Sequence, residues 1–201
     1  MLSIISEKIR ILKDYNRIAR IDRIARRYFV MNSFDGVLAI MGILIGSLIA
    51  GAGRETVLKT SIAAGIAMAV SGVWGAYLTE RAERQKELHD LEKATLSKLG
   101  KTQIGRAANA AVIIIAIIDG VAPLISALAV ISPFFLMQKI VPLQSLYYIS
   151  VGIGFFLLFT LGIFLGRLSK ESIIKTGIIM LLAGVVSLAL NYLLLGGAHV
   201  A

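Results

Sequence analysis

Five long apolar runs constrain this chain more than any other feature of its sequence. They cover about residues 33–53, 57–79, 108–136, 142–166 and 173–195. Each run has the roughly 20 residues that an α-helix needs to cross the hydrocarbon core of a bilayer. The hydrophobic share of 57% agrees, since soluble domains lie nearer ~45–50%. The sequence therefore predicts an all-α integral membrane protein with five transmembrane helices.

Basic residues are distributed unevenly between the two ends of these runs. Eight Lys and Arg lie in residues 1–31, seven in 80–107 and three in 167–175, whereas the other connections hold the remaining three of the 21. Because positive residues favour the cytoplasmic side, we expect the N-terminus inside and the C-terminus outside. In a prokaryote the host would be the cell membrane. The same distribution accounts for the net charge of +9 without nucleic acid as a partner.

The charge pattern divides the chain into four segments. Residues 1–31 are predicted to form a basic amphipathic helix in the headgroup interface, and 32–79 a transmembrane hairpin. Residues 80–107 form a charged cytoplasmic helical segment, and 108–201 contain spans three to five. A straight helix over 80–99 would project about 30 Å at ~1.5 Å per residue. We therefore expect the 80–107 segment to fold over or to lie on the membrane.

Small residues at four-residue spacing predict where the helices approach each other closely. One such stripe in the second run is expected to mark a face inside the bundle; it contains Ala63, Ala67, Ser71 and Gly75. Gly162 and Gly166 predict another close contact in the fourth run.

Asp119 is the one ionisable side chain in the 30 residues from Ala107 to Leu136. A carboxylate in hydrocarbon is costly and by default faces the bundle interior, where it marks a pathway or a site. Pro123 has no N–H to donate to the carbonyl of residue 119. This predicts a broken helix that coordinates a cation near the midplane. The alternative is a neutral Asp that is hydrogen-bonded to an Asn or Ser on a neighbouring helix.

The tripeptide Asp-Gly-Val around Asp119 occurs once more, at Asp35, close to the cytoplasmic start of the first run. The repetition is compatible with a weak internal repeat and equally with chance. Asp35 could be a ligand, or it could be solvated or paired with Arg26 or Arg27. Met68 in the second run is either a soft ligand or a filler between helices.

An acidic stripe follows the second run. Its members lie at i, i+3, i+7 and i+10 on one helical face: Glu80, Glu83, Glu87 and Asp90. Like charges at this spacing repel each other, and a divalent cation would relieve that repulsion, because carboxylate oxygens suit hard or borderline metals. The alternative is a solvated helix with ordinary ion pairs, such as Glu80–Arg84 and Lys86–Asp90.

Three stretches in this order resemble the vacuolar iron transporter family. They are "FDGVLAIMGILIGSLIAG", "AAGIAMAVSGVWGAYLTERAER" and "APLISALAVISPF", and the resemblance covers most of the chain from Ser33. It implies a homodimer that exports cytosolic Fe²⁺ or Mn²⁺ in exchange for protons and gathers metal on a carboxylate-rich segment after the second span. The family's first-span Asp corresponds to Asp35. Gly72 and Ala76 stand where the family has Met and Glu, and Met68 lies one turn from that Met.

Taken together, these features predict a divalent metal transporter that is not an enzyme and has no resident cofactor. We expect the transported metal to meet Asp35, Asp119, Met68, Glu80, Glu83, Glu87 and Asp90. An intramembrane enzyme is one alternative. However, the Gly-x-Gly-Asp setting of aspartyl proteases is absent, and so are the later acids of the CDP-alcohol phosphotransferase motif. A structural membrane protein without transport activity is the other alternative.

Overall fold

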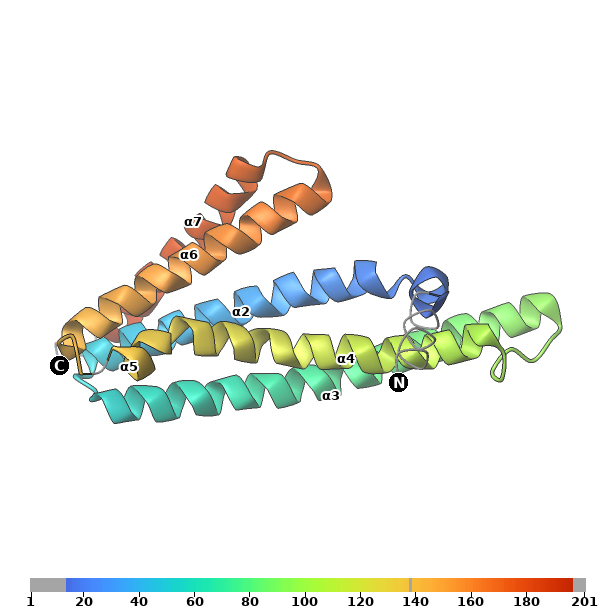
Figure 1. Ribbon diagram of the computed structural model, residues 1–201, viewed down its shortest axis with the longest axis horizontal. Helices are drawn as coiled ribbons and strands as arrows, with labels where there is room; N and C mark the ends of the chain where they lie inside the picture. Colours follow the sequence, from blue (N-terminus) through green and yellow to red (C-terminus); the bar gives the residue numbers. More distant parts are fainter. Residues whose placement is uncertain (1–13, 138, 197–201) are drawn as a thin grey trace, which may run out of the picture. The chain divides into compact units, whose positions relative to one another are not determined.

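The computed structural model describes residues 14–137 and 139–196. A short helix over residues 14–19 precedes the numbered helices (Figure 1). These are α2 (Ile21–Ile49), α3 (Arg54–Thr95), α4 (Gln103–Val130), α5 (Ser132–Leu136), α6 (Leu143–Ser169) and α7 (Ile173–Gly196). Within the described ranges, five helices are long and apolar enough to cross a membrane. The all-α class and the five membrane-length helices are thus confirmed.

The predicted segment boundaries fall inside helices rather than between them. The boundary at residue 31 lies within α2, which begins at Ile21. Arg20, just before α2, has a left-handed backbone with φ 51°, and there the chain turns from the 14–19 helix into α2. The N-terminal part of the predicted interfacial helix, residues 1–13, lies outside the described residues.

The charged segment after the second apolar run does not fold over as expected. α3 continues as one helix of 42 residues to Thr95, and α4 already begins at Gln103. The turn between them is closed by the Glu92 carboxylate, which accepts hydrogen bonds from the Leu99 and Gly100 N–H groups at 2.7 and 3.2 Å. The chain returns through α4, which begins eight residues after the end of α3. The other expectation, that the segment lies on the membrane, stays a prediction.

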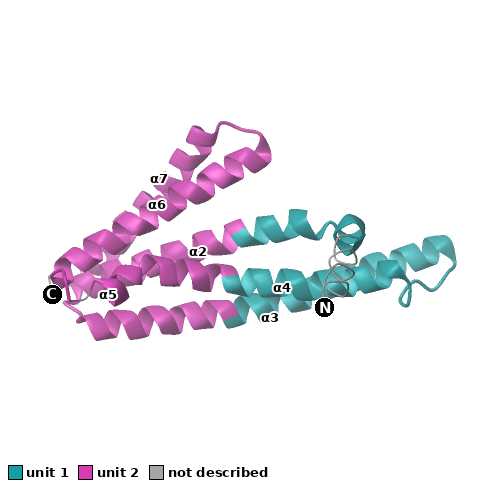
Figure 2. Ribbon diagram, in the orientation of Figure 1, with its two compact units in different colours: residues 1–29, 70–121 teal, residues 30–69, 122–201 magenta. Residues whose placement is uncertain are grey.

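The chain divides into two compact units, which are described separately (Figure 2). Unit 1 comprises residues 1–29 and 70–121, and unit 2 comprises residues 30–69 and 122–201. In unit 2, α6 and α7 pack closely at Gly162, where an added Cβ would lie 2.6 Å from the Cα of Gly177. A Cβ added at Gly166 would lie 2.9 Å from the Cα of Ile173. The close contact predicted at these two glycines is therefore confirmed.

The core of unit 2 joins α6 to the connection between α2 and α3. The ring of Phe134 packs edge-on against Tyr147, with centroids 5.3 Å apart. The Tyr147 hydroxyl donates a hydrogen bond to the Ala52 carbonyl at 2.8 Å. Met68 is partly buried and packs against this core, which agrees with its reading as filler.

The small-residue stripe of α3 faces outward, contrary to expectation. Ala63, Ala67, Ser71 and Gly75 are all exposed. α3 instead turns a second set of small residues toward its neighbours, including Gly65, which lies against Leu124, and Gly72, which lies against Gly120. A helix with small residues on two faces does not reveal from its sequence which face is covered.

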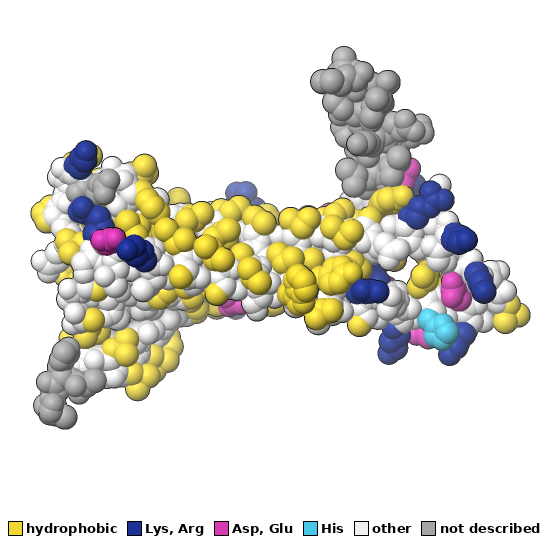
Figure 3. Space-filling view, turned by 90° about the horizontal axis from the view of Figure 1, so that it is seen from below, with side chains coloured by type: hydrophobic (Ala, Val, Ile, Leu, Met, Phe, Trp, Pro, Cys, Tyr) yellow, Lys and Arg dark blue, Asp and Glu magenta, His cyan; other side chains and the backbone are white. Residues whose placement is uncertain are grey.

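Large apolar side chains remain exposed along the helices (Figure 3). In α7, only 6% of the most apolar 18-residue window is buried, compared with 56% in α4. Apolar surface on this scale marks contact with a membrane or another protein. The helices are therefore compatible with a multi-pass membrane protein whose α4 is the most enclosed element.

Candidate functional site

Unit 1 contains the buried acidic side chains of the described part of the chain. Glu80 on α3 is 3% exposed, and Asp119 on α4 is 6% exposed. Glu80 lies on the inner face of α3, one turn beyond the buried Ala76. Buried carboxylates require compensating hydrogen bonds or opposite charges, so their neighbours define the chemistry of this site.

Tyr28, near the start of α2, connects the two buried acids. Its hydroxyl donates a hydrogen bond to the Glu80 side chain, and Asp119 lies within electrostatic reach of the same tyrosine. Tyr28 therefore hydrogen-bonds to one buried acid and interacts electrostatically with the other. Sequence reasoning missed Tyr28, because a tyrosine within a basic segment carries no signal that distinguishes it from an interfacial anchor.

Arg84, one turn beyond Glu80 on α3, neutralises this acidic region. Its Nε lies 3.7 Å from the Glu80 Oε2, and its Nη1 lies 3.1 Å from the Glu87 Oε2. Its Nη2 donates a hydrogen bond to the Ala19 carbonyl at 3.2 Å, which ties the 14–19 helix to α3. The Glu80–Arg84 pair is the alternative that the sequence left open. Lys86 and Asp90 form no ion pair within the described ranges.

A cavity of about 270 Å³ opens beside this arginine. Its lining combines three acids with three guanidinium groups and three apolar residues: Glu80, Glu83, Glu87, Arg20, Arg27, Arg84, Ile18, Ala19 and Ile24. Three members of the predicted acidic stripe therefore share one cavity, whereas Asp90 does not line it. Among the described residues, no three His, Asp or Glu side chains are grouped closely enough to hold a metal ion.

α4 is not broken at Pro123 as the sequence predicted. The helix runs without interruption from Gln103 to Val130 with the proline inside it. Nor does the Asp119 carbonyl face an open space. A Cβ added at Gly72 would lie 3.1 Å from that oxygen and 3.0 Å from the Gly120 Cα. Close packing of α3 on α4 thus covers the carbonyl that the proline leaves without its helical donor.

The remaining predicted residues, Asp35 and Met68, belong to unit 2. Asp35 is exposed on α2, and the adjacent Gly36 packs on the backbone of Pro123, where an added Cβ would lie 2.7 Å from its Cα. The described ion pairs include none between Asp35 and either Arg26 or Arg27. Arg26 pairs instead with Asp22 at 2.9 Å.

These observations define an all-helical protein with five helices of membrane-spanning length and buried acids in one of its two units. No protein-family model matches the chain. Over 167 residues it is 33% identical to the "Uncharacterized protein MJ0645" of Methanocaldococcus jannaschii, an alignment that covers 82% of this chain and 84% of the relative. The chain belongs to the same family as this archaeal protein.

Proposed function

We propose that the protein is a membrane transporter that exports a divalent transition-metal ion, Fe²⁺ or Mn²⁺, from the cytosol in exchange for protons. The observation that carries the proposal is Asp119, a carboxylate 6% exposed within the most enclosed of the membrane-length helices. A charged group at such a position is costly, and it typically marks an ion or proton pathway.

The cavity beside Arg84 supports a role in gathering the transported ion. It is lined by Glu80, Glu83 and Glu87, and carboxylates are the oxygen ligands that such ions accept. Arg84 holds two of these acids with its own positive charge. A divalent ion would take over this neutralising role when it displaces the guanidinium group. After the ion has left, the acids would be able to take up protons, which provides the exchange.

We extend the proposal to a homodimer. Asp35 is exposed on a helix of membrane-spanning length, where contact between a carboxylate and lipid would be costly. A second copy would shield it and could add a second carboxylate. Exposed Ala63 and Ala67 on α3 also permit close approach of another helix in a membrane. The chain has no cysteine, so disulfide crosslinking of an Ala67→Cys variant in membranes tests the dimer directly.

Metal uptake by purified protein in liposomes tests the transport activity. Fe²⁺, Mn²⁺ and Zn²⁺ would be compared, with a pH-sensitive dye recording proton movement in the opposite direction. We expect uptake of Fe²⁺ or Mn²⁺ with simultaneous proton flux. No metal-dependent flux with any of the three ions would refute the proposal.

Binding of metal to the acidic cavity can be tested separately by calorimetry. Glu87 lines the cavity, whereas Asp90, one turn further along the same exposed helix segment, does not. We expect Glu87→Gln to weaken Mn²⁺ binding roughly tenfold or more, and the matched Asp90→Asn variant to bind as the native protein does. If Glu87→Gln and Asp90→Asn bound Mn²⁺ with equal affinity, the cavity would have no role in gathering the metal ion.

A second candidate, a membrane protein without transport activity, is favoured by one observation. Arg84 already compensates Glu80 and Glu87, as expected for a purely structural ion-pair network. This candidate predicts that neither Mn²⁺ nor Fe²⁺ alters the thermal stability of the purified protein, whereas a transporter that binds these ions is stabilised by them.

A further inference from the structure

We infer that unit 1 carries a binding site for a membrane lipid with an anionic, phosphate-bearing headgroup, located in the groove between α3 and α4. Two adjoining cavities form this groove, and both have Tyr77 and Ile113 in their linings. One is apolar and the other has a mixed lining with three polar side chains, so that together they match the two chemical parts of a phospholipid. The site is distinct from the acidic cavity and does not depend on metal transport.

The apolar cavity has a volume of about 430 Å³. Besides the two shared residues, its lining consists of Val73, Trp74, Ala116 and Ile117. Trp74 is 68% exposed and Ile117 52%, so this lining is open to the surroundings along the flank of the two helices. On a helix of membrane-spanning length, such a trough fits a hydrocarbon chain.

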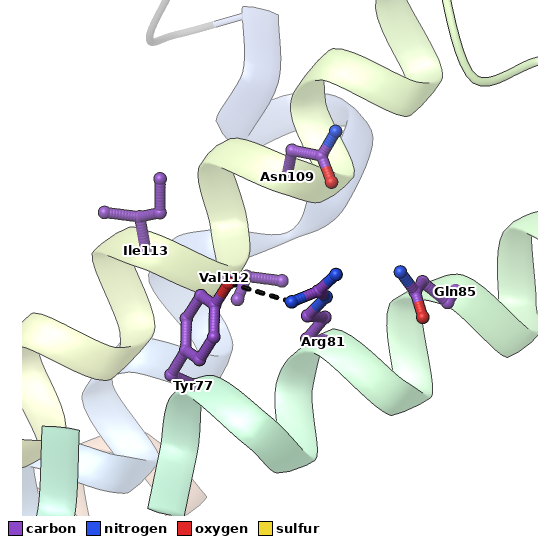
Figure 4. A pocket seen from close by; sticks show the side chains of 6 residues that line it. All are labelled: Tyr77, Arg81, Gln85, Asn109, Val112 and Ile113. Atoms are coloured by element: carbon purple, nitrogen blue, oxygen red, sulfur yellow. Dashed lines mark hydrogen bonds between the residues drawn. The ribbon is translucent and has the colours of Figure 1, made fainter. Parts of the chain in front are cut away.

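The second cavity, of about 280 Å³, is lined by Tyr77, Val112 and Ile113 together with the polar side chains of Arg81, Gln85 and Asn109. The side chains of Arg81 and Gln85 on α3 and Asn109 on α4 point toward the same space (Figure 4). Arginine donates through a planar fork that suits phosphate oxygens, and the two amides supply further donors and acceptors. This combination fits a phosphate and the polar groups next to it.

Arg81 is positioned and charged for this role. Its Nη1 donates a hydrogen bond to the Tyr77 hydroxyl at 3.1 Å, and its guanidinium carbon lies 5.8 Å from the centre of the Tyr77 ring. It forms no ion pair with a carboxylate in the described part of the chain. Arg84, one turn away, by contrast forms ion pairs with Glu80 and Glu87. The positive charge of Arg81 is therefore available to an anion.

The depth of the site agrees with a lipid rather than a soluble anion as the occupant. Trp74 and Tyr77 are the aromatic types that gather at the membrane–water interface. They lie at the end of the second apolar run, and Arg81 follows within one turn. A basic pocket between membrane helices at this depth is a typical position for an anionic headgroup, with its hydrocarbon chain alongside Trp74.

Trp74 provides the readout, because it is the only tryptophan of the chain. The protein would be reconstituted in phosphatidylcholine vesicles that contain brominated phosphatidylglycerol or, at equal mole fraction, brominated phosphatidylcholine. Bromine quenches the tryptophan on contact. We expect the anionic lipid to compete for the site about fivefold better, which corresponds to about 1 kcal/mol for one basic side chain. Equal quenching by the two lipids would overturn the inference.

Arg81→Ala should abolish the preference while general quenching by surrounding lipid persists. Arg106→Ala is the matched control, because Arg106 is an exposed arginine on α4 outside both cavities. It should keep the full preference, and Arg81→Lys should keep part of it. If Arg81→Ala kept the preference for the anionic lipid, the proposed site would be wrong. Loss of the native preference on addition of soluble glycerol phosphate would overturn its assignment to a lipid.

Discussion

The same tripeptide, Asp-Gly-Val, produces two different environments in this protein. In both places the glycine packs against a neighbouring backbone: Gly36 lies on Pro123, and Gly120 lies against Gly72. The preceding acids differ, because Asp119 is buried whereas Asp35 is exposed. Both copies of the tripeptide therefore make a close helix contact through their glycine. Whether the acid is buried depends on what surrounds each helix.

Helix geometry explains this difference. Adjacent residues point about 100° apart around a helix of 3.6 residues per turn. α4 is enclosed over a broad arc, and 56% of its apolar window is buried, so that both Asp119 and Gly120 fall within that arc. In α2, with 39% buried, the narrower covered face includes Gly36 and leaves Asp35 outside. A buried acid must therefore be identified from packing and cannot be read from its motif.

The largest expected effect comes from neutralising the two acids separately. Asp119→Asn preserves shape and removes the charge, so we expect it to abolish metal transport in proteoliposomes while the protein still inserts and dimerises. Asp35→Asn should raise the apparent KM for metal more than it lowers the maximal rate, because in the proposed transporter this exposed acid would lie where the ion enters.

Glu55→Gln is a suitable control for both variants, because Glu55 is an exposed acid that pairs with Lys59 at 2.6 Å. Full transport by Asp119→Asn would mean that the buried carboxylate is structural. Equal kinetic profiles of Asp35→Asn and Asp119→Asn would remove the functional distinction between the two acids.

The sequence was sufficient to predict the helical fold because run length and hydropathy are properties of single segments. Five apolar runs became five helices, and the glycines at 162 and 166 lie at a close contact as predicted. The continuous path of α4 through Pro123 was not predicted. A proline removes one hydrogen bond, but a membrane helix tolerates it where neighbouring helices satisfy the freed backbone group.

Of the candidate site, the sequence predicted the acidic residues but not their partners. The stripe drew attention to Glu80, Glu83 and Glu87, and these residues do share a cavity. The partners that determine its chemistry lie far away in the sequence, since Tyr28 contacts Glu80 and the Ala19 carbonyl accepts from Arg84. Such pairings arise from tertiary structure, and no local pattern encodes them.

The buried acids of unit 1 also depend on Arg84, which pairs with Glu80. Arg84→Ala would leave Glu80, 3% exposed, without its ion pair and would release the 14–19 helix from α3. Breaking a buried pair from one side typically costs about 3–5 kcal/mol, so thermal unfolding in detergent should occur at a clearly lower temperature. Hydrogen exchange should accelerate in residues 14–19 before it does so elsewhere.

Arg26→Ala is the matched control for this experiment. Arg26 pairs with Asp22, but both side chains are about half exposed, at 45% and 55%, and exposed pairs contribute roughly 0–1 kcal/mol. Similar losses of stability in Arg26→Ala and Arg84→Ala would show that Arg84 does not hold the buried acids in place.

The smallest effects concern the two glycine contacts, and they test whether the two tripeptides share a packing role. A Cβ at Gly36 would lie 2.7 Å from both the Cα and the carbonyl oxygen of Pro123, and neither backbone atom can move aside by a rotamer change. At Gly72 the nearest atoms, in Gly120 and Asp119, are 3.0–3.2 Å away. Overpacking typically costs about 1–3 kcal/mol.

We therefore expect Gly36→Ala to lie in the upper part of that range and Gly72→Ala in the lower part. Gly75→Ala is the control, because no atom lies within 4 Å of its Cβ position and alanine favours a helix. For a chain of this size, 1 kcal/mol corresponds to roughly 2–4 °C in melting temperature, which a thermal scan in detergent resolves. If Gly36→Ala were as stable as Gly75→Ala, the α2–α4 contact would be looser than this geometry requires. The repeated glycine would then have no common role in packing.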